Sequence, residues 1–303
     1  MRGISLAVLS CMFLALHPIL AKLMLSYMSP WVFVGLTSFL GALLLMSILE
    51  VEHKIREIKN LSLRDVLVLF AVAMLSGVIA PIVYIFGLSQ TSVANAVLLL
   101  RFNAVLIAFL GVVLLKEKFS LNQFIGTVIM VLGAVVIVTK CFSVPLTSSR
   151  GDLLVLAATV CFTLGNVIMK KHLCRVPPEV IVIGRNAFAG ILILSLTYSD
   201  VPNNLTSQGL IYLGLFVILV IAVGQSLWYS ALEHTSAIEA GLASFSLPVF
   251  GIIYAVGLMG ETLEEHQIMG GALIIFGLLA IELHLSSIKR IGRRLKGIHF
   301  HSH

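Results

Sequence analysis

The chain has 303 residues, of which 59% are hydrophobic and only 11% are charged, and its mean hydropathy is +1.08. Ordinary soluble domains carry about a quarter charged residues, so this composition excludes a soluble protein with an apolar core. The formal net charge is +6, and its meaning depends on where the basic residues lie relative to the apolar stretches.

Apolar stretches of about the 20 residues that a membrane-spanning helix needs recur along the whole chain. In chain order, the ten predicted spans cover 4–25, 30–49, 65–88, 92–115, 119–140, 151–169, 178–199, 207–232, 236–259 and 266–285. The first stretch has no convincing small-residue cleavage site, so we interpret it as a retained helix rather than a signal peptide. The sequence therefore predicts an all-α integral membrane protein with ten transmembrane helices.

Basic residues gather on one side of these spans. With a cytoplasmic N-terminus, fifteen of the twenty lysines and arginines lie on the cytoplasmic side, whereas only Lys140 and Arg150 lie outside. This positive-inside bias predicts that both termini are cytoplasmic. The basic tail, 286–303, is expected to contact anionic lipid headgroups. The positive charge thus indicates the lipid bilayer as a partner, and nucleic acid is not expected.

The chain also repeats itself. A shift of 144 residues aligns 84–137 with 228–281 without a gap, and the earlier helices repeat with slightly different offsets. The polar and glycine matches include Thr91/Thr235, Ser92/Ser236, Glu117/Glu261, Gln123/Gln267, Gly126/Gly270 and Gly133/Gly277. Each half, 1–141 and 150–285, holds five spans, an odd number, so the halves must enter the membrane from opposite sides. Such inverted repeats are typical of secondary transporters, which bind substrate near the midplane between the halves.

The second-half pattern WYSALEHTSAIEAGLASFSLPVF, followed by GETLEEHQIMGGALIIFG, resembles the EamA-type exporters of the drug/metabolite transporter superfamily. The resemblance covers essentially the whole chain. It implies two inverted five-helix repeats around a central cavity formed mainly by the first, third, fourth, sixth, eighth and ninth helices. In the first half, Ala104 and Ile107 replace Pro248 and Gly251 of the second, so we expect its fourth helix to bend less easily.

Two arginines, Arg101 and Arg185, lie deep within predicted spans. Arginine inside a membrane costs at least roughly 2.5–3.5 kcal/mol on insertion scales, so it normally faces a cavity or a partner. A guanidinium fork suits a carboxylate or a phosphate on a substrate. Both arginines, with Asn103 beside Arg101, are therefore candidate substrate ligands, and pairing with Glu239 is the alternative.

Other polar residues in the spans are candidates for binding or coupling. Glu239 replaces the Asn95 of the first repeat and shares a helix face with Ser246, so it could carry a coupling proton or bind a substrate amine. A solvated carboxylate near the interface is the alternative for Glu239. His17 invites a proton-relay role, although a hydrogen-bonded helix contact is the simpler interpretation. Three aromatic residues are predicted to wall the cavity: Tyr84, Trp228 and Tyr229.

Prolines and glutamates near the helix ends are candidates for hinges and gates. Pro81 and Pro248 are predicted hinges. Glu117 and Glu261 follow the fourth helix of each half, so an inverted fold places them on opposite membrane faces, where they could close the two gates. Capping of the following helix is the alternative, because the helix dipole favours a carboxylate at a helix start.

The predicted function is secondary transport. The chain is expected to export a small metabolite, an amino acid or a related carboxylate-bearing compound, by alternating access, driven by a proton gradient or by the substrate gradient. A facilitator of the same fold is the alternative. An integral-membrane enzyme is disfavoured because neither HExxH nor GxSxG occurs. We expect no metal and no cofactor, the bacterial inner membrane as the location, and make no prediction of oligomeric state.

Overall fold

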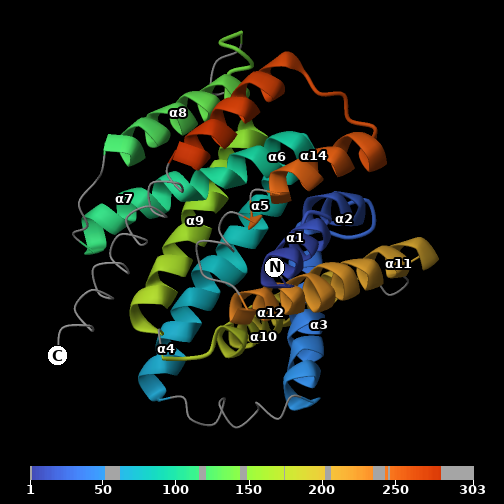
Figure 1. Cartoon of the computed structure of the whole chain (residues 1–303). Helices are drawn as coiled ribbons and strands as arrows, with labels where there is room; N and C mark the ends of the chain where they lie inside the picture. The colour runs from blue at the N-terminus through green and yellow to red at the C-terminus, as the bar shows by residue number, and fades with distance from the viewer. Residues whose placement is uncertain are drawn as a thin grey trace, which may run out of the picture.

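The computed structural model describes residues 2–51, 62–115, 121–143, 149–173, 175–201, 206–234, 243–244 and 246–280. Within these residues every regular element is a helix (Figure 1). Six helices are long and apolar enough to span a membrane, and four shorter apolar helices occupy the remaining predicted spans. Large apolar side chains such as Phe109 (59% exposed) and Phe276 (65% exposed) lie on the surface, where lipid can cover them. The predicted all-α membrane class is confirmed.

In the described part of the first half, eight α-helices are joined in two places by a π-helix or a 3-10 turn. The α-helices are α1 (Arg2–Leu14), α2 (His17–Met24), α3 (Pro30–Val51), α4 (Leu63–Val72), α5 (Ala80–Leu88), α6 (Val93–Leu99), α7 (Asn103–Leu115) and α8 (Leu121–Val138). The π-helix η2 (Ala73–Ile79) joins α4 to α5, and the 3-10 turn η3 (Leu100–Phe102) joins α6 to α7.

The second half follows a similar plan. Its labelled elements are α9 (Arg150–His172), α10 (Pro178–Leu196), the 3-10 turn η5 (Tyr198–Asp200), α11 (Ser207–Leu215), the π-helix η6 (Phe216–Gln225), α12 (Ser226–His234) and α14 (Ser246–Met259). A further apolar helix covers Glu265–Ala280. The two π-helices correspond, because the 144-residue shift carries η2 into η6. Such segments are rare and often mark functional sites.

Local sequence explains the break between α1 and α2 and the start of α4, but not the interruption at η3. The first span breaks between α1 and α2, directly before Pro18, whose ring and missing N–H do not fit a helix interior. A capping box between Ser62 and Asp65 starts α4. The fourth span of the first half, expected to bend less easily, is interrupted nevertheless, since Arg101 lies at the centre of η3. No proline is present there to account for it.

Contacts between the halves build the core. Helix α3 packs against α10, α5 against α9, and α1 against α12. The shift that relates the halves exchanges the last two pairs, because it carries α5 into α12 and α1 into α9. A continuous cluster of buried apolar side chains, from Ile19 in α2 to Ile274 near the C-terminal end, fills the space between the helices.

Helix α8 and the helix Glu265–Ala280 lie side by side and touch through glycines (Figure 1). A Cβ added to Gly270 would lie 2.7 Å from the carbonyl oxygen of Gly133, and one added to Gly277 would lie 2.6 Å from that of Gly126. The residue number of the contacting glycine rises along one helix as it falls along the other, so the two helices run antiparallel. Glycine lets the backbones approach this closely, as is common between membrane helices.

We predict that Gly270→Ala destabilises the protein by roughly 1–3 kcal/mol, because the added methyl group forces the two backbones apart. Thermal unfolding in detergent measures the effect. Gly257→Ala is the matched control, since a Cβ there meets no atom within 4 Å. It should leave stability unchanged or raise it slightly. Equal effects of the two substitutions would contradict close packing at Gly270.

Candidate functional site

A cavity of about 140 Å³ lies between the two halves. It is lined from the first half by α2, α3, η2 and α5, and from the second by α9, α10 and η6. Its polar lining consists of His17, Thr37, Ser38, Ser76, Tyr84, Arg185, Asn186 and Gln225. The resemblance led us to expect the fourth and ninth helices in the wall. Among the described residues, however, the second and seventh predicted helices, α3 and α10, line the cavity in place of those two.

Arg185 is the fixed positive charge of this cavity. It projects from α10, and a Cβ on Gly77 of η2 would lie 3.0 Å from its Cγ and 3.3 Å from its carbonyl oxygen. Any larger residue at position 77 would therefore press on the stem of the arginine. The neighbouring Asn186 is buried and lines the same cavity. A guanidinium and an amide that line one cavity can both donate hydrogen bonds to a carboxylate.

Aromatic rings form another part of the cavity wall. The imidazole of His17 lies 5.8 Å from the ring of Tyr84 and 5.1 Å from that of Phe216, measured between centroids. The hydroxyl oxygen of Tyr84 and the Oε1 of Gln225 are buried and have no hydrogen-bond partner in the described part of the chain. The cavity thus combines one cation, apolar walls and two unsatisfied polar atoms, a composition typical of small-molecule sites.

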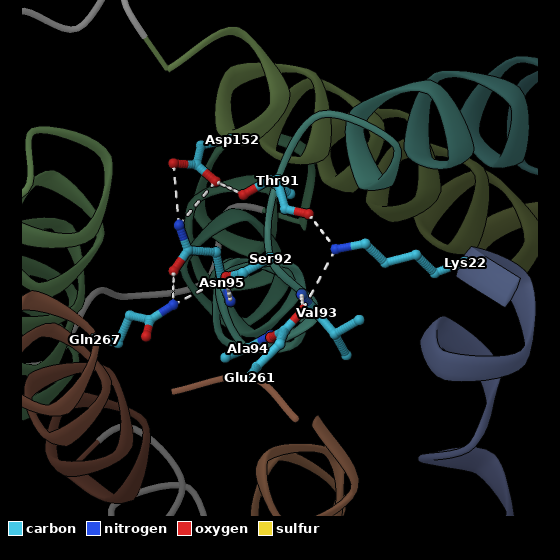
Figure 2. A network of polar contacts seen from close by, with 9 residues as sticks. All are labelled: Lys22, Thr91, Ser92, Val93, Ala94, Asn95, Asp152, Glu261 and Gln267. Atoms are coloured by element: carbon cyan, nitrogen blue, oxygen red, sulfur yellow. Dashed lines mark hydrogen bonds and ion pairs between the residues drawn. The ribbon is translucent and has the colours of Figure 1, made fainter. Parts of the chain in front are cut away.

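A second polar arrangement joins the halves away from the cavity, and Figure 2 shows it. The carboxylate of Glu261 accepts hydrogen bonds from the backbone N–H groups of Val93 (2.8 Å) and Ala94 (3.1 Å) at the start of α6. Lys22 Nζ lies 3.3 Å from Glu261 Oε1 and donates to the carbonyl oxygen of Thr91 at 2.7 Å. Glu261 therefore does cap a helix, but that helix is α6 and not the one that follows it.

Asp152, at the start of α9, anchors the other side of this arrangement (Figure 2). It is 4% exposed and accepts from the Thr91 hydroxyl at 2.5 Å and from Asn95 Nδ2 at 3.1 and 3.2 Å. Gln267 Nε2 donates to Asn95 Oδ1 at 2.8 Å and to Ser92 Oγ at 2.9 Å. We call these residues, with Lys22 and Glu261, the inter-half network.

Comparison with known proteins now adds the family. The model of the EamA-like transporter family matches residues 1–139 and 149–283. The chain belongs to the EamA-like transporter family. The resemblance noted in the sequence is confirmed, and the protein is a membrane transporter.

Relatives of this EamA-like transporter occur in archaea and bacteria. An uncharacterized transporter of Methanothermobacter thermautotrophicus is 28% identical, over 89% of this chain and 82% of its own. One of Synechocystis is 27% identical, over 81% and 73%. A Salmonella typhimurium protein named "probable amino-acid metabolite efflux pump" is 26% identical, over 60% and 65%. A crystal structure with a TM-score of 0.67 is 16% identical and covers 95% of this chain and 98% of that one, which shows the fold alone.

Four of the residues singled out in the sequence line the cavity of the EamA-like transporter. They are His17, Pro81, Tyr84 and Arg185. Gln225 and Asn186 also line the cavity but were not singled out as site residues. The signal that could have found Gln225 is its position within an apolar span that carries few other hydrogen-bonding side chains.

Other predicted site residues lie elsewhere. Arg101 does not line the cavity. Its buried Nε has no hydrogen-bond partner among the described residues, and its charge interacts electrostatically with Cys11 and Tyr84. Ser246 donates to the carbonyl oxygen of Ala243 at 2.7 Å. Trp228 packs against a small cluster of apolar residues around Ala7, Ala231 and Ala243. Asn103 begins α7, and Pro248 is buried in α14. Glu117, Glu239 and the side chain of Tyr229 lie outside the described residues.

Asp152 escaped prediction because it looked like an ordinary carboxylate at a helix start. Its partner Asn95 is 57 residues away, and no local pattern connects the two. The available signal was the repeat. In it, Gln267, which donates a hydrogen bond to Asn95, matches Gln123 of the first half.

We predict that Asn95→Leu destabilises the transporter by about 1–3 kcal/mol or more, because it leaves the buried Asp152 carboxylate short of donors. Chemical unfolding in detergent gives the value. Asn166→Leu serves as the control, since Asn166 is an exposed residue of α9. Its free energy of unfolding should change by less than about 0.5 kcal/mol. A similarly small change for Asn95→Leu would show that the network contributes little to stability.

Proposed function

We propose that this EamA-like transporter is a secondary active transporter that exports a small carboxylate-bearing metabolite, such as an amino acid or a related compound. The observation that carries the proposal is the position of Arg185 in a cavity walled by both halves. A cation that lines such a cavity favours an anionic group on the cargo. Export is supported by the name of the Salmonella relative, an amino-acid metabolite efflux pump.

Alternating access is supported by signs that the halves are inverted copies. The glycine pairs Gly126–Gly277 and Gly133–Gly270 are exchanged by the 144-residue shift, as a two-fold axis between related helices requires. The π-helices η2 and η6, which occupy equivalent positions in the two halves, also support this relationship. In inverted repeats, one arrangement of the halves opens the site to one side, and the exchanged arrangement opens it to the other.

The inter-half network is proposed as the outer gate. With the N-terminus cytoplasmic, the turn between α5 and α6, the start of α9 and Glu261 all lie on the outer face. The network fixes that turn to both α2 and the second half, so opening the outer face requires these contacts to break. Glu261 would thus close the gate through its bonds to α6 and Lys22. Glu117, its match in the first half, is proposed for the inner gate on sequence alone.

Protons are proposed as the coupling ion, with His17 in the cavity and Glu239 as the candidate carriers. An imidazole can accept a proton at one ring nitrogen and donate one from the other, which suits it to passing a proton during each cycle. A facilitator of the same fold remains the alternative, and transport that ignores a pH gradient and a protonophore would favour it. An enzymatic function finds no support in the relatives, which are named as transporters.

The cargo proposal is tested with purified protein in proteoliposomes and a panel of labelled amino acids, nucleotides and sugar phosphates. We expect the amino-acid or carboxylate group to be transported. We expect Arg185→Gln to lower the initial rate at least tenfold, because the buried anion loses its charged partner. Arg150→Gln, at an exposed arginine outside the cavity, should retain the wild-type rate. Transport that survives Arg185→Gln unchanged would refute recognition by this arginine.

The gate proposal is tested by thiol labelling in cells. A cysteine-free variant carrying Ser38→Cys reports access to the cavity, which Ser38 lines. We expect Glu261→Gln to raise labelling by an impermeant maleimide from outside at least twofold, since the ion pair with Lys22 is lost. Lys140→Met, at an exposed lysine of the same face, is the control. If both variants label like the parent, Glu261 does not hold the outer face closed.

A further inference from the structure

A second cavity, of about 560 Å³, lies beside the inter-half network and is polar. The charged side chains of Lys140, Arg150 and Glu264 line it and are exposed, so it opens to the surface. Asp152 and His266 line it too, but they are only 4% and 5% exposed. With the N-terminus cytoplasmic, this surface faces outside. The cavity thus connects a buried carboxylate to the external solution.

The hydrogen bonds that lead to Asp152 have a fixed direction. The backbone N–H of Glu264 can only donate, and it donates to Gln267 Oε1 at 2.9 Å. The Nε2 of Gln267 therefore donates to Asn95 Oδ1 at 2.8 Å (Figure 2). Asn95 must then turn its Nδ2 toward Asp152, whose two oxygens lie 3.1 and 3.2 Å away. Each amide is oriented by the one before it, so Asp152 receives a donor, and its ionised form is the one that fits.

A proton on Asp152 would conflict with this arrangement. On Oδ1 it meets two donors, Thr91 and Asn95, and on Oδ2 it meets the Asn95 amide nitrogen, which has no acceptor capacity. The Thr91 hydroxyl can turn and accept, but Asn95 cannot, because Gln267 holds its other end. Hydrogen bonds to an ionised group are also about twice as strong as those between neutral groups. Protonation therefore loosens the turn between α5 and α6 from the start of α9.

Other charged and titratable groups surround Asp152. His266, in the helix Glu265–Ala280, and Lys140, after α8, interact with it electrostatically. The Nδ1 of His266 lies 3.3 Å from Glu264 Oε2. The remaining charges are on Arg150 of the same helix and on the Lys22–Glu261 pair, which holds the other side of the turn. Because His266 also titrates, a test must separate its response from that of Asp152.

The repeat provides each membrane face with one carboxylate at this position. RGISL (2–6) matches RGDLL (150–154), so Ile4 stands where the second half has Asp152. Glu239, in turn, stands where the first half has Asn95. An inverted fold places positions 4 and 239 together on the inner face, as it does 152 and 95 on the outer face. In each pair one position, and not the other, carries the acid.

We propose that Asp152 is the proton-binding group of the outer gate. A proton from the external solution binds the carboxylate through the polar cavity, breaks its contact with Asn95 and opens the outer face. Binding of the external proton is thereby linked to opening toward the side where the cargo leaves. This inference rests on the proposed function, because it takes the inter-half network as the outer gate.

Thiol labelling in right-side-out membrane vesicles tests the proposal, with the cysteine-free Ser38→Cys variant as the reporter and an impermeant maleimide outside. Ser207→Cys, at an exposed residue of the same face, corrects for the effect of pH on the thiol reaction itself. The external pH is varied from about 8 to about 4, which covers the ordinary range of carboxyl titration. We expect the Ser38 label, relative to the Ser207 label, to rise at least twofold on acidification.

Variants assign this response to the carboxylate. Asp152→Asn keeps the shape but removes the charge, so the relative label should be at least twofold above the parent at pH 8 and independent of pH. Asp200→Asn, at an exposed aspartate of the same face, is the matched control and should behave like the parent. Combining Asp152→Asn with Asn95→Asp exchanges the two groups while Gln267 and Thr91 keep their donors. This double variant should regain both the low label at pH 8 and the rise on acidification.

The outcomes distinguish this inference from the gate proposal. If Glu261→Gln raises labelling but Asp152→Asn labels like the parent, the gate stands and Asp152 is not its proton-binding group. If His266→Gln abolishes the rise while Asp152→Asn retains it, the histidine binds the proton and the inference is refuted. A double variant that folds, by thermal unfolding in detergent, but stays labelled at pH 8 also refutes it. If neither Glu261→Gln nor Asp152→Asn raises labelling, the outer gate itself is wrong, and this inference fails with it.

Discussion

Apolar side chains gain little by leaving lipid for another helix, so a membrane protein cannot rely on the hydrophobic effect to bring its helices together. In this chain, close backbone contact and shared polar groups hold the halves together instead. Gly133 and Gly270 let two helices approach until a methyl group no longer fits between them. In the inter-half network, Asn95 donates to the Asp152 carboxylate and Glu261 accepts from the backbone N–H of Val93 across the same divide. The cavity lies between the halves at a place where neither the glycine contacts nor the inter-half network joins them.

The two polar regions differ in whether their groups are satisfied. In the inter-half network, the Asp152 carboxylate, the Asn95 amide and the Glu261 carboxylate all have partners within the chain. In the cavity, Tyr84 and Gln225 offer atoms that no described residue bonds. An unsatisfied buried atom costs free energy in the empty protein. The satisfied groups of the network hold the halves together, whereas the two atoms in the cavity have no partner among the described residues.

Much of the fold was open to prediction because a bilayer restricts the choices. Only helices satisfy the backbone in lipid without an adjoining strand, so hydropathy predicts both their presence and their approximate ends. Polar matches such as Thr91/Thr235 and glycine matches such as Gly126/Gly270 revealed the repeat. The π-helices η2 and η6 have no such signature in the hydropathy pattern. Asp152 was hidden because its partners come from a distant part of the chain.

Arg101 shows where prediction by counting residues stops. Position along a span predicts the depth of a side chain, which for Arg101 is near the midplane, but not the direction in which it points. That direction is set by the 3-10 turn η3, which changes the rotation per residue just where Arg101 lies. The guanidinium consequently interacts with Tyr84 and Cys11 rather than lining the cavity. Its charge can still favour an anion at the site through Tyr84, since fields extend further in a medium of low dielectric constant than in water. Arg185 lines the cavity, whereas Arg101 acts on the same region only through its charge, which interacts with Tyr84.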